Sequence, residues 1–166
     1  MKSPVAQPID QVLLEQITKK ALNSPRKRMN HNFHQPEDVI QRFLNAIEPD
    51  SYIRPHRHVN PDREEIFLVL KGKGAVVLFD NNGTTQGIHL LDASLGFRGV
   101  DIPGGLYHAI VSIEPGSVFY EVKQGPYNPN ADKGFAPWSP EEGSEEAIEY
   151  LNHLRQGVID YRLTLT

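Results

Sequence analysis

The sequence contains no cysteine among its 166 residues. Disulfide bonds are therefore excluded, and so is any metal site built on thiolate ligands. Long apolar runs are also missing, because no stretch approaches the roughly 20 residues of a membrane-spanning helix. The first residues contain no apolar signal core. We therefore expect a cytoplasmic protein that does not interact with membranes.

An excess of positive charge is absent as well, since the formal net charge is −4. Proteins that bind nucleic acid generally present a basic face, so nucleic acid is not expected as a partner. The hydrophobic fraction of 39% and the charged fraction of 23% are those of an ordinary globular protein. A chain of this length most often forms one domain with a sizeable core.

What is present is a succession of short apolar segments separated by turns. One turn is Asn81-Asn-Gly83, and Asn-Gly between two apolar runs is a strong hairpin signal. The expected strands are Tyr52–His58, Glu65–Lys71, Ala75–Asp80, Thr85–Leu91, Gly99–Ile102, Ala109–Ile113 and Val118–Lys123. Many short strands with this spacing predict a mainly β protein that folds as a sandwich or barrel.

The two ends of the chain have a different pattern. Ile9 to Asn23 predicts a helix, whereas Val39 to Ile47 is ambiguous between helix and strand, and the barrel context favours strand. A second helix is expected around Ala147, ending near Gly157. The tail from Ile159 to Thr166 alternates apolar and polar residues, which predicts a further strand in this chain or in a partner.

Four residues have the spacing of a metal site: His56, His58, Glu65 and His108. Residues two apart in a strand share a face, so the first two histidines present their imidazoles to one point. Three neutral imidazoles and one carboxylate suit a divalent transition metal. A lone histidine in a strand is more often a surface or core residue, and His89 and His153 are expected to be solvated for that reason.

This spacing closely resembles the two cupin motifs, His-x-His-(x)3–6-Glu-(x)6-Gly and Pro-x-Gly-xx-His. The matching residues are His56, His58, Glu65 and Gly72 in the first motif and Pro103, Gly105 and His108 in the second. Glu64 is a rival fourth ligand, but Glu65 keeps the six-residue spacing to Gly72. Ser112 stands where many cupins carry Asn. The resemblance implies a cupin double-stranded β-helix, a jelly-roll barrel with an N-terminal helix and a C-terminal helical arm.

The flanking segments narrow the resemblance. Ser24-Pro-Arg-Lys-Arg28 precedes the barrel and Lys133-Gly-Phe-Ala-Pro-Trp138 follows it. From about Ile9 to Leu154 the chain is similar to the WbuC-type cupin-fold metalloproteins, which are named from bacterial surface-polysaccharide gene clusters. We expect residues 1–38 to form an N-terminal helix and basic arm, 39–127 the barrel, and 128–166 a C-terminal arm and helix packed on it.

Several other polar residues are candidates for the same site. Glu121 and Lys123 share one face of the last barrel strand and could act as acid and base. The alternative is a surface ion pair, which contributes little to stability. Tyr52 and Arg54 share strand parity with the first two histidines, so they are expected to point inward beside the metal.

Four further residues are candidates for binding the substrate. Arg28 is the best placed of a short basic stretch to meet a phosphate or carboxylate, although a solvated basic turn is the more ordinary interpretation. Asn32 and His34 could fold over the barrel mouth. Tyr107 stands directly before the last ligand, where the family resemblance implies Trp, and the resemblance therefore implies that it keeps an aromatic lid.

The expected function is that of a metal-dependent cupin acting on a small polar molecule, such as a sugar or sugar nucleotide of surface-polysaccharide metabolism. Isomerase or lyase chemistry would suit one divalent metal per chain, Fe, Mn, Ni, Co or Zn, with up to two coordination positions open for substrate or water. The alternatives are a non-catalytic, metal-anchored binding protein and an Fe(II) dioxygenase. Cupin barrels commonly pair through sheet edges and terminal arms, so we expect a homodimer.

Overall fold

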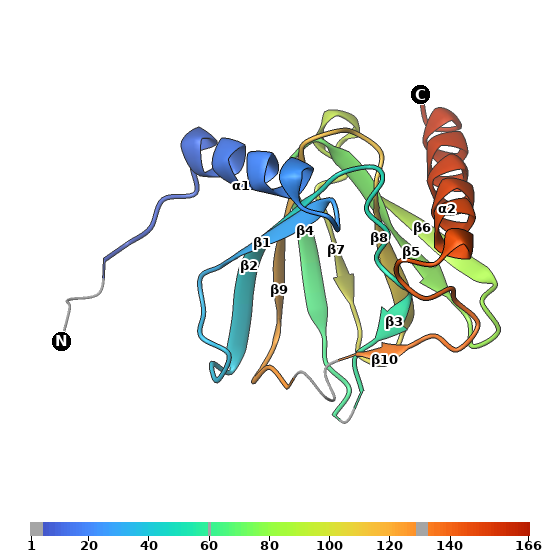
Figure 1. Cartoon of the computed structure of the whole chain (residues 1–166), viewed down its shortest axis with the longest axis horizontal. Helices are drawn as coiled ribbons and strands as arrows, with labels where there is room; N and C mark the ends of the chain where they lie inside the picture. Colours follow the sequence, from blue (N-terminus) through green and yellow to red (C-terminus); the bar gives the residue numbers. More distant parts are fainter. Residues whose placement is uncertain (1–4, 60, 129–132) are drawn as a thin grey trace.

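The computed structural model describes residues 5–59, 61–128 and 133–166, and within them two five-stranded sheets face each other (Figure 1). The first sheet has the strand order β1-β2-β9-β4-β7 and the second β10-β3-β8-β5-β6, with antiparallel neighbours throughout. The strands are β1 Arg28–Asn32, β2 Ile40–Ile47, β3 His56–Arg57, β4 Glu65–Lys71, β5 Lys73–Phe79, β6 Thr85–Asp92, β7 Gly99–Ile102, β8 Tyr107–Ser112, β9 Ser117–Gln124 and β10 Gly134–Phe135. The expected mainly β, jelly-roll architecture with a helix near each end is confirmed.

The space between the two sheets changes from apolar to polar along neighbouring strands. On β9 the inward-facing residues run from Phe119, which is fully buried in the core, to Glu121 and Lys123. On β4 the same alternation runs from Phe67 back to Glu65, which pairs in register with Lys123. One end of the barrel is therefore lined by charged side chains, although its centre is a hydrocarbon core.

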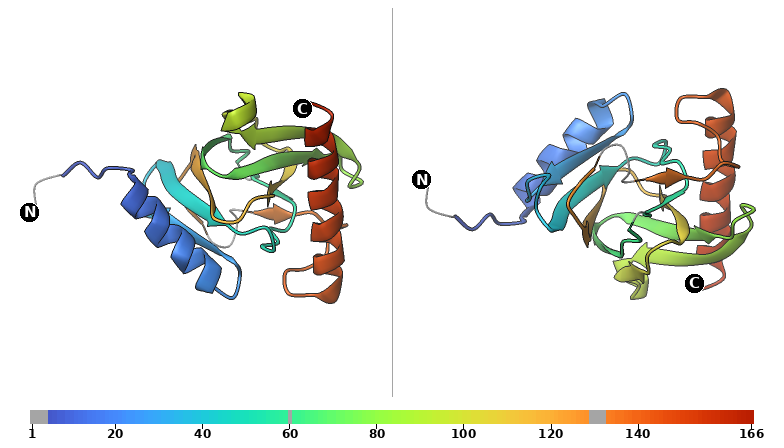
Figure 2. Two further views of the ribbon diagram at one scale, coloured as in Figure 1. Left: turned by 90° about the horizontal axis from the view of Figure 1, so that it is seen from above. Right: turned by 90° about the horizontal axis from the view of Figure 1, so that it is seen from below.

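Each helix covers the outer face of one sheet (Figure 2). Helix α1, Gln11–Asn23, begins at Asp10, whose carboxylate accepts a hydrogen bond from the backbone of Leu13, and it packs on the first sheet. Helix α2, Glu145–Leu163, packs on the second sheet, and a short 3₁₀ turn, Ala93–Leu95, follows β6. Neither α1 nor α2, the helices of the described residues, has the length and apolar character to cross a membrane.

The prediction of a C-terminal strand from Ile159 is wrong, because α2 continues through this segment. Leu151, Leu154 and Val158 form one buried stripe at helical spacing, and the last turn is held by Arg162, whose Nε donates to Asp92 at 2.7 Å. A glycine inside a helix costs about 1 kcal/mol relative to alanine. The contacts of the buried stripe and of Arg162 outweigh the unfavourable helix propensity of Gly157, so the helix continues past this residue.

The strand boundaries differ from expectation in two places. The strand expected over Tyr52–His58 is reduced to β3, since Pro55 has no backbone N–H with which to continue the ladder. Strand β1 was not expected, and it pairs with β2, which confirms the choice of strand for the ambiguous segment. The edge strands β1 and β10 both come from outside residues 39–127, the segment that was expected to form the whole barrel. We therefore propose that the N-terminal, central and C-terminal segments form one domain.

Candidate metal centre

Three histidines from the second sheet and its margin meet one glutamate from the first. His56 pairs directly with His108 in the register of β3 and β8, and Glu65 opens β4 in the facing sheet. The exposed fractions of His56, His58, Glu65 and His108 are 5%, 2%, 3% and 2%. One ligand atom from each residue lies within 4.8 Å of all the others. The fold thus brings the four predicted ligands together.

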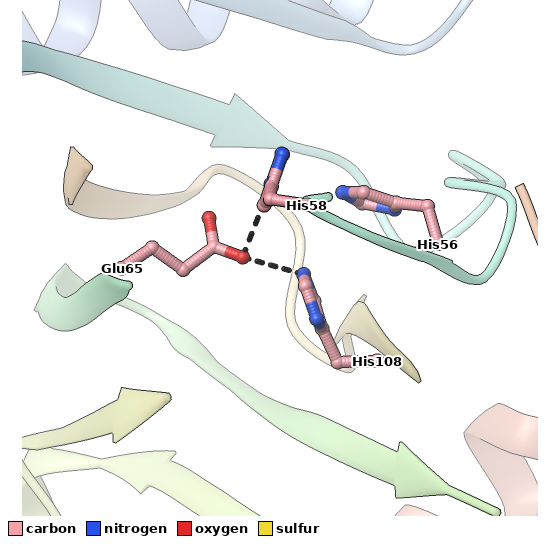
Figure 3. Close-up of side chains that lie close together, drawn as sticks. All are labelled: His56, His58, Glu65 and His108. Atoms are coloured by element: carbon pink, nitrogen blue, oxygen red, sulfur yellow. Dashed lines mark ion pairs between the residues drawn. The ribbon is translucent and has the colours of Figure 1, made fainter. Parts of the chain in front are cut away.

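Glu65 approaches two of the histidines in this group, which we call the His3Glu cluster. Its Oε1 lies 2.6 Å from Nε2 of His108 and 3.3 Å from Nε2 of His58, and His56 approaches from the other side (Figure 3). Glu64, the rival ligand considered from the sequence, is exposed. Of the two carboxylates, Glu65 is the one that faces the histidines.

For two of the histidines, a backbone carbonyl determines which ring nitrogen faces the cluster. Nδ1 of His56 lies 3.0 Å from the carbonyl oxygen of Arg54, and Nδ1 of His108 lies 3.0 Å from that of Leu106. A carbonyl oxygen only accepts hydrogen bonds, so Nδ1 carries the proton and Nε2 keeps its lone pair for the cluster. Burial also holds the pKa of His56 well below its ordinary value, which favours the neutral imidazole that binds metals.

The nitrogen and oxygen atoms of the His3Glu cluster are better arranged to coordinate a metal ion than to form hydrogen bonds with one another. Among the described residues, neither oxygen of Glu65 nor Nε2 of His108 has a hydrogen bond of acceptable geometry, although both side chains are buried. Burial alone would raise the pKa of Glu65, but His108 and His58 outweigh it and hold that pKa well below its usual range. A buried, ionised carboxylate is costly unless it is paired or coordinated. The four residues could therefore hold a divalent metal.

A second acidic group lies in the same interior. Glu121 and Lys123 are both buried, and Nδ2 of Asn45 donates a hydrogen bond of 3.3 Å to Oε2 of Glu121. Burial, followed by the charge of Glu65, raises the pKa of Glu121 to about 8 although nearby lysines oppose the shift. A carboxyl group that titrates near neutral pH is suited to proton transfer. Asn45 was not foreseen, because its position beside Glu121 depends on the pairing of β2 with β9, which is far away in the sequence.

Tyr107 and Tyr52 lie on the other side of the second sheet, contrary to expectation. Neighbouring residues of a strand face opposite ways, so Tyr107 points away from the cluster and packs against Trp138 at a ring distance of 5.9 Å. The hydroxyl of Tyr52 donates to the carbonyl of Pro140. Both tyrosines belong to the core between the second sheet and α2. Tyr107 is therefore not an aromatic lid over the His3Glu cluster.

The two arginines connect other parts of the chain to the C-terminal arm, residues 133–144. Nε of Arg54 donates to Oγ of Ser139, and its guanidinium lies 5.2 Å from the ring centroid of Phe135. The parity argument that pointed Arg54 inward fails because the backbone before β3 is not in a ladder. Arg28 donates to both carboxylate oxygens of Glu142, at 2.8 and 2.7 Å. Its guanidinium thus joins β1 to the arm, and it also donates to the carbonyl of Tyr52 at 2.8 Å.

The remaining candidates lie near the turn between β1 and β2. Nδ1 of His34 accepts a 2.8 Å hydrogen bond from the backbone N–H of Arg42, and its ring lies 5.8 Å from that of Phe43. Phe43 is the register partner of Glu121, so His34 is close to the charged end of the barrel. Asn32, at the end of β1, is exposed. His89 and His153 are exposed, as expected.

The sequence of the chain matches a known family over residues 9–91, half of its length. The chain belongs to the family described as a domain of unknown function, DUF6016. No protein with a curated description matches it in sequence. Membership of DUF6016 therefore does not indicate which reaction, if any, the chain catalyses.

Solved structures share the fold of this DUF6016 chain. The capsular polysaccharide assembling protein CapF from Staphylococcus aureus is 22% identical, with a TM-score of 0.53, over 65% of this chain and 32% of CapF. The salicylate 1,2-dioxygenase from Pseudoaminobacter salicylatoxidans is 14% identical, with a TM-score of 0.53, over 75% of this chain and 36% of the dioxygenase. This chain thus spans about a third of the length of each, and the likeness shows the fold alone.

Removing one imidazole should weaken metal binding. We expect His108→Ala to lower the affinity for Co(II) on the order of 100-fold or more, since one of four ligands and its oriented Nε2 are lost. The absorption spectrum of bound cobalt measures this. The matched control is His89→Ala, which removes an exposed histidine. Equal cobalt affinity of the two variants would contradict the ligand assignment.

The burial of Glu121 should make folding depend on pH. Because its folded pKa of about 8 exceeds the ordinary 4.5, the unfolded chain ionises first, so stability is lost as pH rises between these values. We expect Glu121→Gln to remove this loss, which is on the order of a few kcal/mol. Urea unfolding of chelator-treated protein from pH 5 to pH 9 tests it, with exposed Glu37→Gln as the control. Parallel profiles for Glu121→Gln and the unchanged protein would refute this account.

Proposed function

We propose that this chain is a metal-dependent enzyme that acts on a small polar molecule, with a sugar or sugar nucleotide as the substrate class. The observation that carries the proposal is the His3Glu cluster, buried in the same interior as Glu121 and Lys123. A metal site that served stability alone would not require a second buried acid and base beside it. The reaction type that fits best is isomerisation or elimination, since both begin with the removal of a proton from carbon.

Each residue has a distinct part in the proposed reaction. His56, His58, Glu65 and His108 would hold the metal, which when bound polarises a carbonyl or hydroxyl oxygen of the substrate. Glu121 would take a proton from carbon, with Asn45 fixing the position of Oε2. It would return that proton to the neighbouring carbon in an isomerisation, or give it to the leaving oxygen as the carbon–oxygen bond breaks in an elimination. Lys123, buried on the same face of β9, would stabilise negative charge that develops on the substrate.

The solved neighbours support different versions of this proposal. CapF is described as a capsular polysaccharide assembling protein, which is in keeping with a sugar substrate and with the WbuC-type resemblance. The dioxygenase neighbour favours the alternative of an Fe(II) dioxygenase. The other alternative is a metal-anchored binding protein in which Glu121 and Lys123 only hold the ligand. A cytoplasmic location belongs to the same proposal.

Proton transfer can be detected before the substrate is known. Protein purified without oxygen or nickel resin is first assayed for its metal and then incubated in D2O with aldoses, ketoses and sugar nucleotides. We expect one class to take up deuterium next to its carbonyl, as seen by NMR. We expect Glu121→Gln to slow this exchange on the order of 100-fold or more, because the proton acceptor is lost. Its metal content should stay the same.

The control and the alternatives give distinct results in this experiment. Glu37→Gln, which removes an exposed carboxylate, should exchange deuterium at the unchanged rate. Stoichiometric iron with consumption of oxygen would establish the dioxygenase instead. Binding of a sugar with no deuterium uptake would establish the binding protein. Either result would reject the proposed enzyme.

We also propose a homodimer. The outer face of the first sheet is only partly covered by α1, and Ile40, Leu68 and Leu70 on this sheet are exposed large apolar side chains. Burying such side chains against a second copy contributes roughly 25 cal/mol for each Å² of apolar surface. Light scattering at micromolar concentration should give twice the mass of the chain. A monomeric mass at that concentration would contradict the proposal.

A further inference from the structure

The amide of Asn45 is only half satisfied by the residues around it. This side chain is 7% exposed, and its Nδ2 donates a hydrogen bond of 3.3 Å to Oε2 of Glu121. A carboxylate oxygen only accepts hydrogen bonds, so an ionised Glu121 takes the amide nitrogen and leaves the amide oxygen for a different donor. Among the described residues, Oδ1 of Asn45 has no hydrogen-bond partner. The fold therefore buries an acceptor that lacks a donor.

The surroundings of Asn45 on its own strand are apolar. It lies on the inner face of β2 between Phe43 and Ile47, and it is opposite Phe119 of β9. All three of these neighbours are buried. A buried acceptor without a donor destabilises the folded chain, whereas an apolar side chain of the same size would not. Stability alone therefore gives no reason for an amide oxygen at this position.

Asn45, Glu121 and Glu65 form a diagonal row across the neighbouring strands β2, β9 and β4 (Figure 1). In the register of the sheet, Asn45 is opposite Phe119 of β9, and Glu65 is opposite Lys123 of β9. Glu121 lies midway between those two residues of β9 and on the same face. Diagonal neighbours on one face lie roughly 7–8 Å apart, within reach of long side chains. Glu121 thus stands between the amide of Asn45 and the His3Glu cluster.

We infer that Oδ1 of Asn45 accepts a hydrogen bond from a hydroxyl group of the ligand, so that this residue selects a polyhydroxylated molecule. The inference rests on the proposed function and adds to it one group by which the substrate is recognised. Because the nitrogen and oxygen of the amide share one carbon atom, the bound hydroxyl lies close to the carbon from which Glu121 takes the proton. A site that binds a substrate hydroxyl rejects the analogue without it, since the buried acceptor is then unpaired.

A series of ketones that differ in their hydroxyl groups tests this recognition. Hydroxyacetone, dihydroxyacetone, erythrulose and xylulose each have a carbonyl oxygen with a hydroxyl beside it, and each has one hydroxyl more than the one before. Their binding to cobalt-loaded protein is followed by the absorption spectrum of the metal. We expect one step of the series to strengthen binding about tenfold, the scale of pairing a buried acceptor with a donor. Asn45→Leu, which has a similar volume and no acceptor, should abolish that step.

Two further variants control for effects on folding and on Glu121. Asn30→Leu changes the exposed register partner of Asn45 on β1 and should leave every affinity unchanged. Asn45→Asp keeps an acceptor oxygen and should keep the step, and loss of the step in this variant would count against the inference. If Asn45 only positions Glu121, Asn45→Leu will weaken the binding of all four ketones by the same factor and keep the step. That result would refute recognition by Oδ1.

Failure of the inference is distinguishable from failure of the proposed function. If cobalt binds but no step of the series reaches tenfold, recognition by Oδ1 is refuted and the metal centre stands. If cobalt does not bind, the metal centre is refuted and the inference with it. Deuterium uptake by the ketones is measured separately. A step that depends on Asn45 without deuterium uptake would support the recognised hydroxyl and reject the enzyme in favour of a binding protein.

Discussion

The pairing of β3 with β8 sets His56 opposite His108, and Glu65 of the facing sheet completes a group of ligand atoms within 4.8 Å. This close approach of polar atoms is the constraint on which the charged end of the barrel depends. Such a cluster is unfavourable in a low-dielectric interior unless a cation or a full set of hydrogen bonds compensates it. The apolar core between the sheets and the two helices on their outer faces supply the rigidity that holds these groups together.

Single strands of this fold supply both apolar residues of the core and polar residues of the charged end, because their side chains alternate between two faces. On β9, Phe119 completes the core while Glu121 and Lys123, on the same face, reach the charged end. On β8, His108 faces the cluster while Tyr107 packs under α2. Few positions in these strands are free to change without cost, because each carries either packing or charge. The packing of the core and the positions of the candidate metal ligands thus depend on the same two-residue period.

This period also explains what could be predicted from the sequence. The four candidate ligands were found because they belong to two short motifs, each of which is recognisable in the sequence. Tyr52 and Arg54 were misplaced because the same parity was extended across Pro55, where the ladder stops. Asn45 was overlooked, since its position beside Glu121 depends on the pairing of β2 with a strand far away in the sequence. The helix beyond Gly157 needed the contacts of Val158 and Arg162, which no local pattern contains.

The C-terminal arm carries Trp138, the single tryptophan of the sequence. Its indole ring packs against Phe79 at 5.1 Å and Tyr107 at 5.9 Å, and it lies against Gly83 at the tip of the β5–β6 hairpin, where a side chain would collide with it. Indole fluorescence is sensitive to whether such contacts are dry or hydrated. The intrinsic emission of this protein is therefore a built-in optical reporter of one event, the docking of the arm on the barrel.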